Sequence, residues 1–473
     1  MAEKMRKTKI LATIGPASIN EKVLNKFKDY EVNCLRINTA HGNFEQYTKA
    51  INSARKIQEF CFLLDIKGPE VRIRTKYPIE VTAGQVVPIG FNKKEDAYFS
   101  YDFYNEVAEG DKVFFDNGQI EAKIMLKKDQ KIHLKFVEDS VIRINKGVNI
   151  PNKELKIPSL SKKDKQAIKY AIDNDLDYIA LSFVRNKKDV LQLKKILKNS
   201  DIGIISKIEN WEGVKNIDEI IQESEGIMIA RGDLGVEIPE EKIPIIQKQI
   251  IDKCNEKGKI AIVATQMLES MVTNKLPTRA EVSDVANAIL DGTDCVMLSG
   301  ETAAGKHPIN AVRVMNKVAR EVENNVEKNI DLDVHGNMSE ELSKSAFLLL
   351  QKSTANKLVT ITRSGYSASL ISRFRIGKPI IAVTDNKKSV RKMALVWGVK
   401  PILLDKIPKS SMVTRVGLHL LKRGEVKKED FVIFFAGVKT MQEHVSNLIE
   451  IHYIKDLVEW KKKVLNGELK KLP

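Results

Sequence analysis

Residues 203–232 have the sequence GIISKIENWEGVKNIDEIIQESEGIMIARG, and this stretch contains the unit that decides the fold. Two short runs rich in β-branched residues, 203–209 and 226–232, flank a spacer of helical character. Nearly continuous apolarity is required of a strand that is covered on both faces of its sheet. The stretch therefore predicts two strands of a parallel sheet, with a helix packed outside them.

Six further runs of the same kind recur along the chain, again with helical spacers between most of them. They are TKILATIG (8–15), VNCLRIN (32–38), CFLLDI (61–66), YIALSF (178–183), IAIVATQ (260–266) and CVMLSG (295–300). Eight β–α units make a (β/α)8 TIM barrel, which takes about 250 residues. A chain of 473 residues is longer than one barrel needs and is expected to contain about three domains.

Two regions do not fit the barrel and are expected to form separate domains. Residues 70–157 alternate short strands with Gly and Asn turns, which predicts a small all-β domain inserted after the third barrel strand. Residues 336–473 resume the β–α alternation with KLVTIT, PIIAVT and FVIFFAG, which predicts an open α/β domain. The barrel itself is then expected in residues 1–69 and 158–335.

Composition restricts the compartment and the partners. The start MAEKMRKTKI lacks the apolar core of a signal peptide, and no apolar run approaches the roughly 20 residues of a membrane span, so a cytoplasmic protein is predicted. Its four cysteines form no CxxC pair and are expected to be free and mostly buried: Cys34, Cys61, Cys254 and Cys295.

Charge gives a weaker indication. The chain has 78 Lys and Arg against 62 Asp and Glu, a net charge of +16. No nucleic-acid-binding motif is recognisable and the lysines are spread along the chain, so a solvated basic surface is favoured over a nucleic-acid partner. Residues 455–473 are rich in lysine and predict a charged surface helix.

Polar residues collect at the carboxyl ends of seven of the eight runs, where the active sites of TIM barrels lie. They are Arg36, Asn38, Asp65, Arg185, Lys207, Glu209, Asp233, Thr265, Gln266, Ser299 and Glu301. One or two such residues would be unremarkable because loops are polar anyway. Seven strands ending in this way predict a catalytic site.

Glu209 and Asp233 close two successive runs and are the candidate metal ligands. Two carboxylates with several open positions suit Mg²⁺ or Mn²⁺, which keep waters for substrate. A pair of salt-bridged surface acids is the alternative. The metal interpretation is favoured because buried like charges need a cation.

Lys207 lies two residues before Glu209, so strand alternation places both side chains on the same side. Neighbouring carboxylates keep an ammonium protonated, which fits stabilisation of a moving phosphoryl group better than a Schiff base. Arg36 shares a side with Asn38, and an arginine is suited to binding phosphate oxygens in a bidentate manner. Gly232, in an Arg-Gly-Asp turn, lets the backbone approach an anion closely.

At these residues the sequence resembles the pyruvate kinases. TKILATIGPAS, LLDIKGPEVR, SKIEN, IMIARGDLGVEIP, ATQMLESM and MLSGETA are similar to that family's signatures and occur in its order, within a resemblance that covers about residues 7–454. The resemblance implies a glycolytic enzyme that transfers the phosphoryl group of phosphoenolpyruvate to ADP, giving pyruvate and ATP. It also implies a β domain that acts as a lid, a C-terminal effector domain and a homotetramer.

The resemblance assigns roles residue by residue. It implies that Lys207 is the phosphoryl-transfer lysine and that Glu209 and Asp233 hold Mg²⁺ or Mn²⁺. The backbone around Gly232 and Asp233 would receive the substrate carboxylate, and Thr265 would lie beside the three-carbon unit.

Three further roles follow from the same resemblance. Ser299 would lie in the route that protonates the enolate, and Arg36 would contact the phosphoryl group. Arg72 matches the arginine that follows KGPE and helps to bind nucleotide phosphates, with a second metal ion arriving together with ADP.

Potassium binding is where the sequence departs from the family. The family's K⁺ ligands include an Asn, a Ser, an Asp and a main-chain carbonyl, and Asn38, Asp65 and the carbonyl of Ile66 match three of them. Ala40 replaces the serine and supplies no oxygen. Glu70 is the residue type found in K⁺-dependent members, so the resemblance implies K⁺ dependence with weaker binding.

The segment TRSGYSA (362–368) resembles the family's phosphate loop for an effector. Hydroxyls and successive N–H groups form an anion nest in such a loop. Thr362, Ser364, Gly365 and Ser367 would bind the phosphate of a sugar-phosphate or nucleotide effector. An ordinary strand–helix turn is the alternative interpretation.

Two other functions are weighed against phosphoryl transfer. A metal-dependent lyase or aldolase acting on pyruvate-like acids uses a barrel and an acidic metal pair, but gives no reason for a phosphoryl-directed lysine or a β lid. A basic RNA-binding protein with a degenerate barrel belongs to a different class. The intact set of Lys207, Glu209, Asp233 and Thr265 argues against it.

Overall fold

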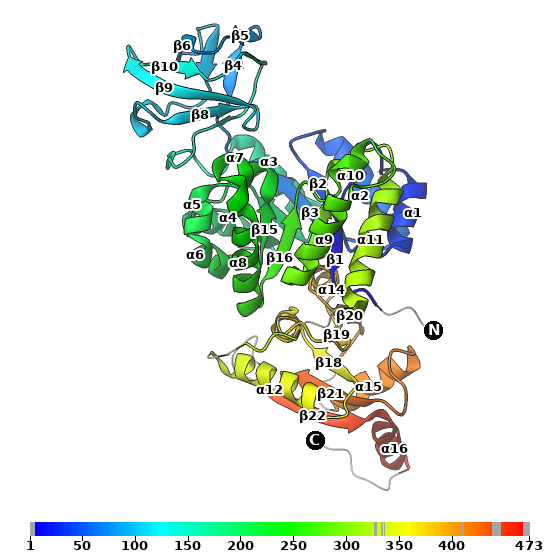
Figure 1. Cartoon of the computed structure of the whole chain (residues 1–473). Coiled ribbons are helices and arrows are strands. Elements are labelled where there is room, and N and C mark those ends of the chain that lie inside the picture. Colours follow the sequence, from blue (N-terminus) through cyan, green and yellow to red (C-terminus); the bar gives the residue numbers. More distant parts are fainter. Residues whose placement is uncertain are drawn as a thin grey trace.

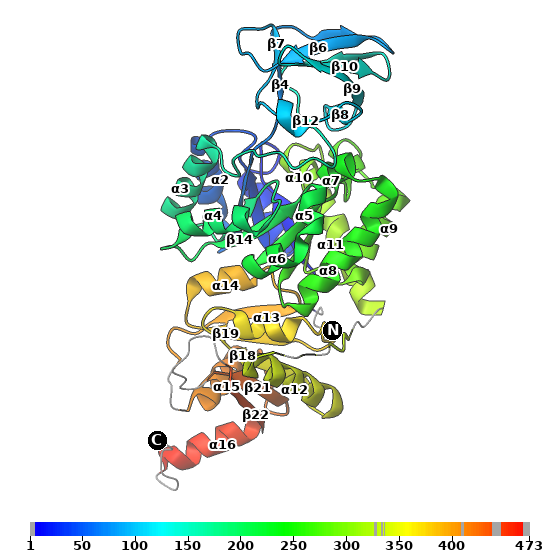
Figure 2. The same ribbon diagram turned by 90° about the vertical axis from the view of Figure 1, so that its left-hand side faces the viewer.

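Three bodies follow one another along the long axis of the molecule (Figure 1). The structure is a computed structural model that describes residues 5–325, 329–332, 334, 336–407, 411–437 and 446–466. A barrel lies in the middle, an all-β domain stands at one end of it, and an α/β domain lies against the other end (Figures 1 and 2).

Eight parallel strands close the barrel in the spatial order β1, β2, β3, β13, β14, β15, β16, β17. They are β1 (Lys9–Thr13), β2 (Cys34–Asn38), β3 (Cys61–Ile66), β13 (Tyr178–Leu181), β14 (Gly203–Ile208), β15 (Gly226–Ala230), β16 (Ile260–Ala264) and β17 (Cys295–Leu298). Each of the eight predicted runs forms one strand, so the TIM-barrel prediction is confirmed.

Strand alternation decides which side chains face the barrel interior. On β3, Phe62 and Leu64 pack outward with the helices, whereas Leu63 belongs to the cluster that fills the barrel. Because side chains alternate, Asp65 follows Leu63 toward the interior. By the same alternation Lys207 follows Ile205, which lies in the interior cluster.

Helices surround the barrel, as each β–α unit requires. They are α1 (Glu21–Asp29), α2 (Phe44–Ile57), α3 (Lys162–Asp173), α4 (Lys187–Leu197), α5 (Trp211–Lys215), α6 (Ile217–Glu223), α8 (Ile243–Glu256), α9 (Arg279–Asp291) and α11 (Pro308–Asn325). Capping boxes begin three of them, at Asn43, Ser161 and Thr278, where side chain and backbone satisfy each other's first-turn groups. Two short helices, α7 (Arg231–Glu237) and α10 (Gly300–Ala303), follow β15 and β17 directly.

The all-β domain follows β3, as predicted. Its larger sheet has the order β12–β8–β9–β10–β6–β7–β4, and β11 pairs with β5. The strands are β4 (Ile73–Thr75), β5 (Ile79–Val81), β6 (Val86–Gly90), β7 (Ala97–Phe99), β8 (Lys112–Phe115), β9 (Ile120–Lys128), β10 (Lys131–Phe136), β11 (Ser140–Ile142) and β12 (Val148–Asn149). Four buried phenylalanines, Phe99, Phe103, Phe115 and Phe136, contribute to its own core.

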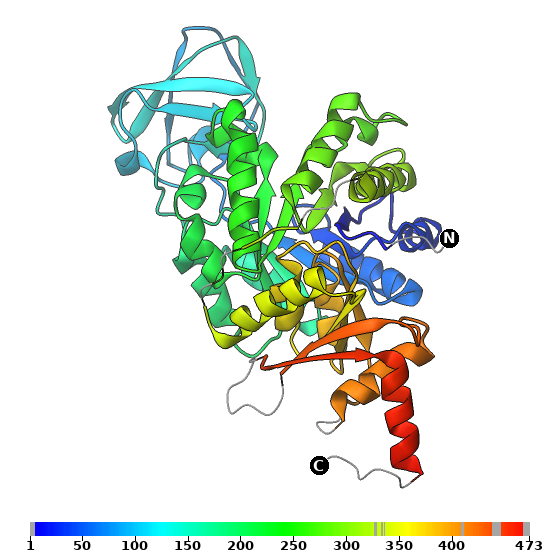
Figure 3. The same ribbon diagram turned by 60° about the horizontal axis from the view of Figure 1, so that its bottom comes forward.

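The C-terminal domain contains a five-stranded sheet in the order β20–β19–β18–β21–β22. The strands are β18 (Lys357–Ile361), β19 (Ile380–Thr384), β20 (Val399–Leu403), β21 (Phe431–Ala436) and the antiparallel edge strand β22 (Leu448–Tyr453), with helices α12 (Met338–Lys352), α13 (Tyr366–Ser372), α14 (Lys387–Met393), α15 (Met412–Lys422) and α16 (Ile454–Leu465). Figure 3 shows α16 projecting from the end of this sheet. It begins one residue before the predicted tail helix and covers residues 455–465 of it, and residues 467–473 of that prediction lie outside the described residues.

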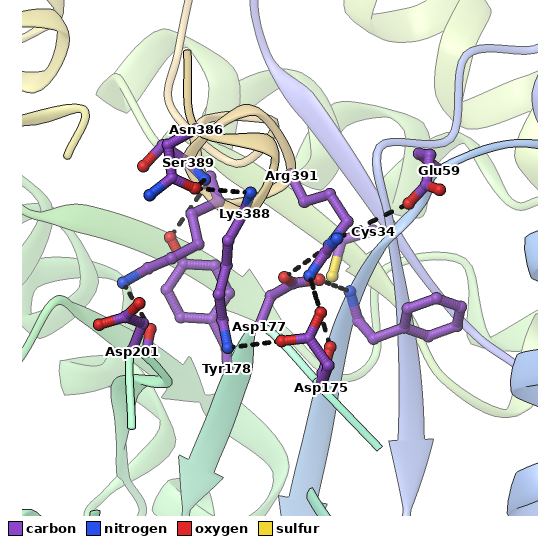
Figure 4. A network of polar contacts seen from close by, with 12 residues as sticks. Cys34, Glu59, Asp175, Asp177, Tyr178, Asp201, Asn386, Lys388, Ser389 and Arg391 are labelled. Atoms are coloured by element: carbon purple, nitrogen blue, oxygen red, sulfur yellow. Dashed lines mark hydrogen bonds and ion pairs between the residues drawn. The ribbon is translucent and has the colours of Figure 1, made fainter. Parts of the chain in front are cut away.

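An ionic network that includes the buried Asp177 and the exposed Asp175 joins α14 to the amino end of the barrel (Figure 4). Arg391 Nε lies 2.8 Å from Asp177 Oδ1, and Arg391 Nη2 lies 2.6 Å from Asp175 Oδ2. Lys388 Nζ adds a contact of 2.9 Å to Asp175. Asp177 is fully buried and immediately precedes β13, so this network fixes the α/β domain to a barrel strand.

The cysteine prediction is also confirmed: Cys34, Cys61, Cys254 and Cys295 are free and buried. Burial raises the pKa of the Cys254 and Cys295 thiols, which keeps them protonated and unreactive. Among the described residues, no helix has the length and apolar character needed to cross a membrane.

Candidate active site

The carboxyl ends of the barrel strands face the all-β domain, because the chain passes from the end of β3 directly into it (Figures 1 and 2). Strand ends that are far apart in the sequence meet here through the closure of the barrel. Arg36, Asp65 and Lys207 lie on three strands, and the structure brings their side chains into direct contact.

Lys207 is the centre of this cluster. Its Nζ lies 2.8 Å from Glu209 Oε1 and 3.3 Å from Asp65 Oδ1, and it donates a 2.8 Å hydrogen bond to Ser182 Oγ. Burial alone would lower the pKa of Lys207, but the carboxylates of Asp65 and Glu209 outweigh it and raise this pKa to about 12. The ammonium is therefore charged at neutral pH.

Arg36 and Lys207 share Asp65 between them. Arg36 Nε lies 2.8 Å from Asp65 Oδ2, and Arg36 Nη1 donates to Thr13 Oγ1 at 2.9 Å. Burial acts to raise the pKa of Asp65, but the two cations outweigh it and hold this pKa below its usual value. Asp65 is thus an anion that holds the guanidinium of Arg36 and the ammonium of Lys207 side by side.

Glu209 is buried, and both of its oxygens have partners. Oε1 faces Lys207, and Oε2 accepts a 2.7 Å hydrogen bond from the amide of Phe183. Burial raises the pKa of Glu209 to about 7, against the effect of Lys207, and the nearby carboxylate of Asp233 acts in the same direction as burial. The two candidate metal ligands are therefore close enough to repel each other.

The donor set fits a hard divalent cation. In the described part of the chain no group of three or more His, Cys, Asp or Glu side chains is placed to hold a metal. Glu209 and Asp233 would supply two carboxylate ligands and leave the remaining positions to water and substrate, which is the arrangement that Mg²⁺ favours. A cation between them would also relieve their repulsion.

A strained turn after β16 lies against the start of α7. Thr265 and Gln266 have φ angles of 67° and 55°, a left-handed backbone that costs free energy in residues other than glycine. Arg231 stabilises this turn, because its Nη2 donates to the Thr265 carbonyl at 2.8 Å. The Gly232 amide donates a 2.8 Å hydrogen bond to Thr265 Oγ1, so the two predicted substrate-binding residues are in contact.

Ser299 lies at the end of β17, where Glu301 shapes the turn. Glu301 Oε2 accepts from the Ser299 amide at 2.7 Å, and Oε1 accepts from the Leu268 amide at 3.1 Å. Gln266 and Glu301 were both predicted at this edge. The exposed Gln266 extends the Thr265 turn, whereas the buried Glu301 supports the backbone beneath Ser299.

The predicted K⁺ residues gather at the ends of β2 and β3. Asn38 pairs with Asp65 in the parallel register, and Ile66 is the next residue of β3. Asn38 Oδ1 accepts a 3.0 Å hydrogen bond from the Ala40 amide. Glu70 lies further along the chain and pairs with Arg72 and Lys67, at 2.6 and 3.4 Å.

Arg72 and Arg185 lie near the connections between the barrel and the all-β domain. Arg72 is bridged to Gly147 at the base of that domain. Arg185 donates to the Leu155 carbonyl at 2.7 Å and forms an ion pair with Asp189 at 3.0 Å, so it anchors the returning connection. A cavity of about 250 Å³ opens between these connections and the barrel, lined among others by Glu70, Asn149, Phe183, Arg185, Trp211 and Glu237.

The predicted effector loop is remote from this end of the barrel, between β18 and α13. Gly365 has a φ of 94°, and its amide donates a 3.0 Å hydrogen bond to Thr362 Oγ1. The amide of Tyr366 lies 3.4 Å from Ser364 Oγ, and Ser367 Oγ is 2.7 Å from Ser446 Oγ. The loop therefore forms a compact turn between strand and helix, which agrees equally with a phosphate loop and with an ordinary strand–helix turn.

Sequence reasoning missed three groups in the catalytic cluster: Ser182, Thr13 and the amide of Phe183. Ser182 and Phe183 were within the fourth predicted run, and Thr13 was within the first. All three lie at the ends of predicted strands, so their general position at this end of the barrel could have been inferred, but their roles could not. Nothing in the sequence separates them from ordinary strand residues, because a neutral hydroxyl or amide carries no signal of its partner.

The fold and the site define a class: a barrel enzyme in which a charged lysine, an arginine and two neighbouring carboxylates lie at the end of the barrel that faces a separate β domain. Comparison with known proteins makes this specific. The family model for the pyruvate kinase barrel domain matches residues 5–312, and the model for the pyruvate kinase alpha/beta domain matches residues 340–452. The chain belongs to the pyruvate kinase family and transfers the phosphoryl group of phosphoenolpyruvate to ADP.

Individual relatives cover nearly the whole chain. The chain is 40% identical to the pyruvate kinase of Sporosarcina psychrophila over 482 aligned positions, covering 96% of this chain and 81% of that protein. It is 38% identical to the pyruvate kinase of Clostridium acetobutylicum, covering 95% of this chain and 100% of the relative. The crystal structure of a pyruvate kinase from Cryptosporidium parvum matches with a TM-score of 0.88 at 36% identity, over 95% of this chain and 96% of that one.

Ser182→Ala tests whether the serine that contacts Lys207 orients it. Removing the hydroxyl leaves the ammonium with its two carboxylates but without its neutral partner. We expect kcat to fall about 10-fold, with little change in KM for phosphoenolpyruvate, since small losses of orientation act mainly on the chemical step. A steady-state assay of pyruvate formation measures both.

Ser206→Ala is the matched control for that variant. Ser206 precedes Lys207 on the same strand, but its hydroxyl faces the opposite way and lies 2.7 Å from Ser224 Oγ. Its kcat should remain at the wild-type level. Equal losses in the two variants would show that Ser182 has no special relation to the lysine.

Proposed function

We propose that phosphoenolpyruvate and ADP react at the cluster around Lys207, and that the site residues predicted from the sequence bind the substrates and cations there. The observation that supports this proposal most strongly is the charged ammonium of Lys207, which lies between Asp65 and Glu209 and beside Arg36. Phosphoryl transfer needs positive groups placed where charge moves, rather than a covalent partner. In this proposal Lys207 stabilises the phosphoryl group in transit, and Arg36 binds its oxygens.

The charges of the cluster support this assignment. Arg36 and Lys207 supply two positive charges, while Asp65, Glu209 and Asp233 supply three negative ones. With Glu209 ionised the cluster has a net charge of −1, and with Glu209 protonated it is neutral, so in neither state does it attract an anionic substrate without a divalent cation. We propose that Glu209 and Asp233 hold Mg²⁺ or Mn²⁺, which when bound neutralises phosphoryl and carboxylate oxygens.

The three-carbon part of the substrate is assigned to the strained turn. The backbone around Gly232 and Asp233 would receive the carboxylate, and its N–H donors would bind this anion together with the divalent cation. Thr265 would lie against the three-carbon unit, and Ser299 would take part in protonating the enolate after transfer. The contact between Gly232 and Thr265 Oγ1 supports treating these two residues as one subsite.

The remaining assignments concern ADP and K⁺. Arg72, at the base of the all-β domain, would bind nucleotide phosphates, and that domain (residues 70–157) would close as a lid that excludes water. Asn38, Asp65 and the Ile66 carbonyl would hold K⁺, with Ala40 supplying no ligand. Glu70 forms an ion pair with Arg72, so the residue that indicates K⁺ dependence contacts the arginine assigned to the nucleotide phosphates.

The distant parts of the chain complete the proposal. Thr362, Ser364, Gly365 and Ser367 would bind a phosphorylated sugar or nucleotide effector. Residues 336–473 would form the effector and assembly domain of a cytoplasmic homotetramer, with the barrel in residues 1–69 and 158–335. Adding phosphorylated sugars and nucleotides to an activity assay tests the effector loop, and no response to any of them would remove it from the proposal.

An omission assay tests the reaction itself. Pyruvate formation from phosphoenolpyruvate is coupled to a lactate dehydrogenase, with ADP, Mg²⁺ and K⁺ left out one at a time. We expect the rate to vanish without ADP or the divalent cation and to fall without K⁺. Pyruvate formation that needs no ADP would indicate lyase or phosphatase chemistry and overturn the proposal.

Ala40→Ser tests the K⁺ assignment. A hard cation that lacks one protein ligand must recruit water and binds less tightly, so the wild type should need more KCl for half-maximal activity than the variant. Activity is measured against KCl at constant ionic strength, balanced with a tetraalkylammonium salt. An identical midpoint in both proteins would show that the missing hydroxyl is irrelevant, and full activity without monovalent cation would remove K⁺ from the site.

A further inference from the structure

The all-β domain contacts the barrel at a helix that also carries substrate-binding groups. Helix α7 is only seven residues long, from Arg231 to Glu237. Its first turn contains Gly232 and Asp233, the proposed ligands of substrate and metal. Its last residues, Val236 and Glu237, contact the all-β domain. A displacement at one end of so short a helix therefore reaches the other end.

Two neighbouring elements of the all-β domain make that contact. Asn149, the last residue of β12, donates a 3.1 Å hydrogen bond from Nδ2 to Glu237 Oε1. Gly118 lies so close to Val236 that a Cβ added there would be 3.4 Å from Val236 Cγ1. The two elements are joined to each other, because β12 pairs with β8 and Lys146 Nζ lies 2.7 Å from Asp116 Oδ1.

The other side of α7 is held firmly by the barrel. Leu234 is fully buried, and Arg231 binds the Thr265 carbonyl and Asp284 at 2.8 and 2.7 Å. The helix thus lies between a rigid support and the all-β domain. Its position depends on both.

Glu237 is an unexpected residue for a purely structural contact. Burial raises its pKa, and among the described residues its hydrogen-bond partner is the amide of Asn149, with no Lys, Arg or His in ion-pair contact. Glu237 is half-buried and lines the cavity between the two domains, and a carboxylate that is partly removed from water without a cation beside it gains no ion-pair stabilisation there. Its presence at the junction of two domains is better explained by a functional role.

We propose that Asn149 and Glu237 form a latch, which sets the position of helix α7 according to the position of the all-β domain. The latch makes both of them positioning residues for phosphoryl transfer: when the domain lies over ADP, α7 presents Gly232 and Asp233 to phosphoenolpyruvate. This inference rests on the proposed roles of Gly232 and Asp233. It adds a link between nucleotide binding and the substrate subsite.

The test compares Asn149→Ala, Glu237→Ala and the double variant. Loss of the latch misplaces α7 in the closed complex, and misplacement of reacting groups costs at least about 10-fold in rate, so kcat should fall by that factor in each single variant. The double variant should lose no more than the worse single variant, because both changes break the same link. Binding of phosphoenolpyruvate without ADP, measured by calorimetry in the presence of Mg²⁺, should change by less than about twofold, since this step does not involve the lid.

Two further variants separate a latch from a structural role. Glu237→Gln keeps an oxygen that accepts from Asn149, and should restore most of kcat. Asn149→Asp places two carboxylates against each other and should lose more than Asn149→Ala. Glu154→Ala is the control, because Glu154 is an exposed carboxylate that lines the same cavity. It should behave as wild type.

Several outcomes would overturn the latch. Multiplying losses in the double variant, a loss in Glu154→Ala equal to that in Glu237→Ala, or a fall in kcat explained by a lower urea-unfolding midpoint would each do so. If the wild type forms pyruvate in an ADP-dependent reaction while the latch variants keep full kcat, only the latch fails. If the wild type has no such activity, the proposed function fails as well.

Discussion

The ammonium of Lys207 between the carboxylates of Asp65 and Glu209 is the interaction on which the site depends. A buried cation is costly unless opposite charges and hydrogen bonds surround it closely. Here two carboxylates within 3.3 Å keep Lys207 charged, and Ser182 occupies a further donor position. The same carboxylates also contact other groups, Asp65 the guanidinium of Arg36 and Glu209 the amide of Phe183. One buried charge thereby determines the placement of the others.

Only a closed barrel can assemble this arrangement. Arg36 and Asp65 belong to β2 and β3, Lys207 to β14, and Asp233 and Thr265 follow β15 and β16. The strands of the first half meet those of the second through the pairing of β3 with β13 and of β1 with β17. The insertion of the all-β domain after β3 leaves this closure intact. It places the all-β domain at the carboxyl end of the strand that carries Asp65.

The parts predicted from sequence are those with a local physical cause. Apolar runs predict strands because a strand covered on both faces must be apolar, and alternation predicts that Lys207 and Glu209 share a side. Contacts between distant residues have no such signal. Asn149 and Glu237 are 88 positions apart, and Asp177 and Arg391 are 214 apart; these pairings depend on how separate domains dock.

The neutral hydrogen-bond partners of the charged side chains are the second feature that the sequence does not predict. Ser182 and Thr13 satisfy charged side chains, yet a serine or threonine in a strand is ordinary and its partner is decided by packing. The resemblance to a family supplied roles for the charged residues, because those occur in recognisable motifs. It supplied none for the residues that orient them.

The rate of phosphoryl transfer in Lys207→Met tests the central claim most directly. Single-turnover transfer from phosphoenolpyruvate to ADP and the dissociation constant of phosphoenolpyruvate are measured on the same protein, with Lys215→Met as an exposed control at the same end of the barrel. If the charge of Lys207 acts on the phosphoryl group in transit, the transfer rate falls by about 10²–10³ while substrate affinity changes by only a few-fold. Transfer near the wild-type rate, or a loss confined to substrate binding, would contradict the account.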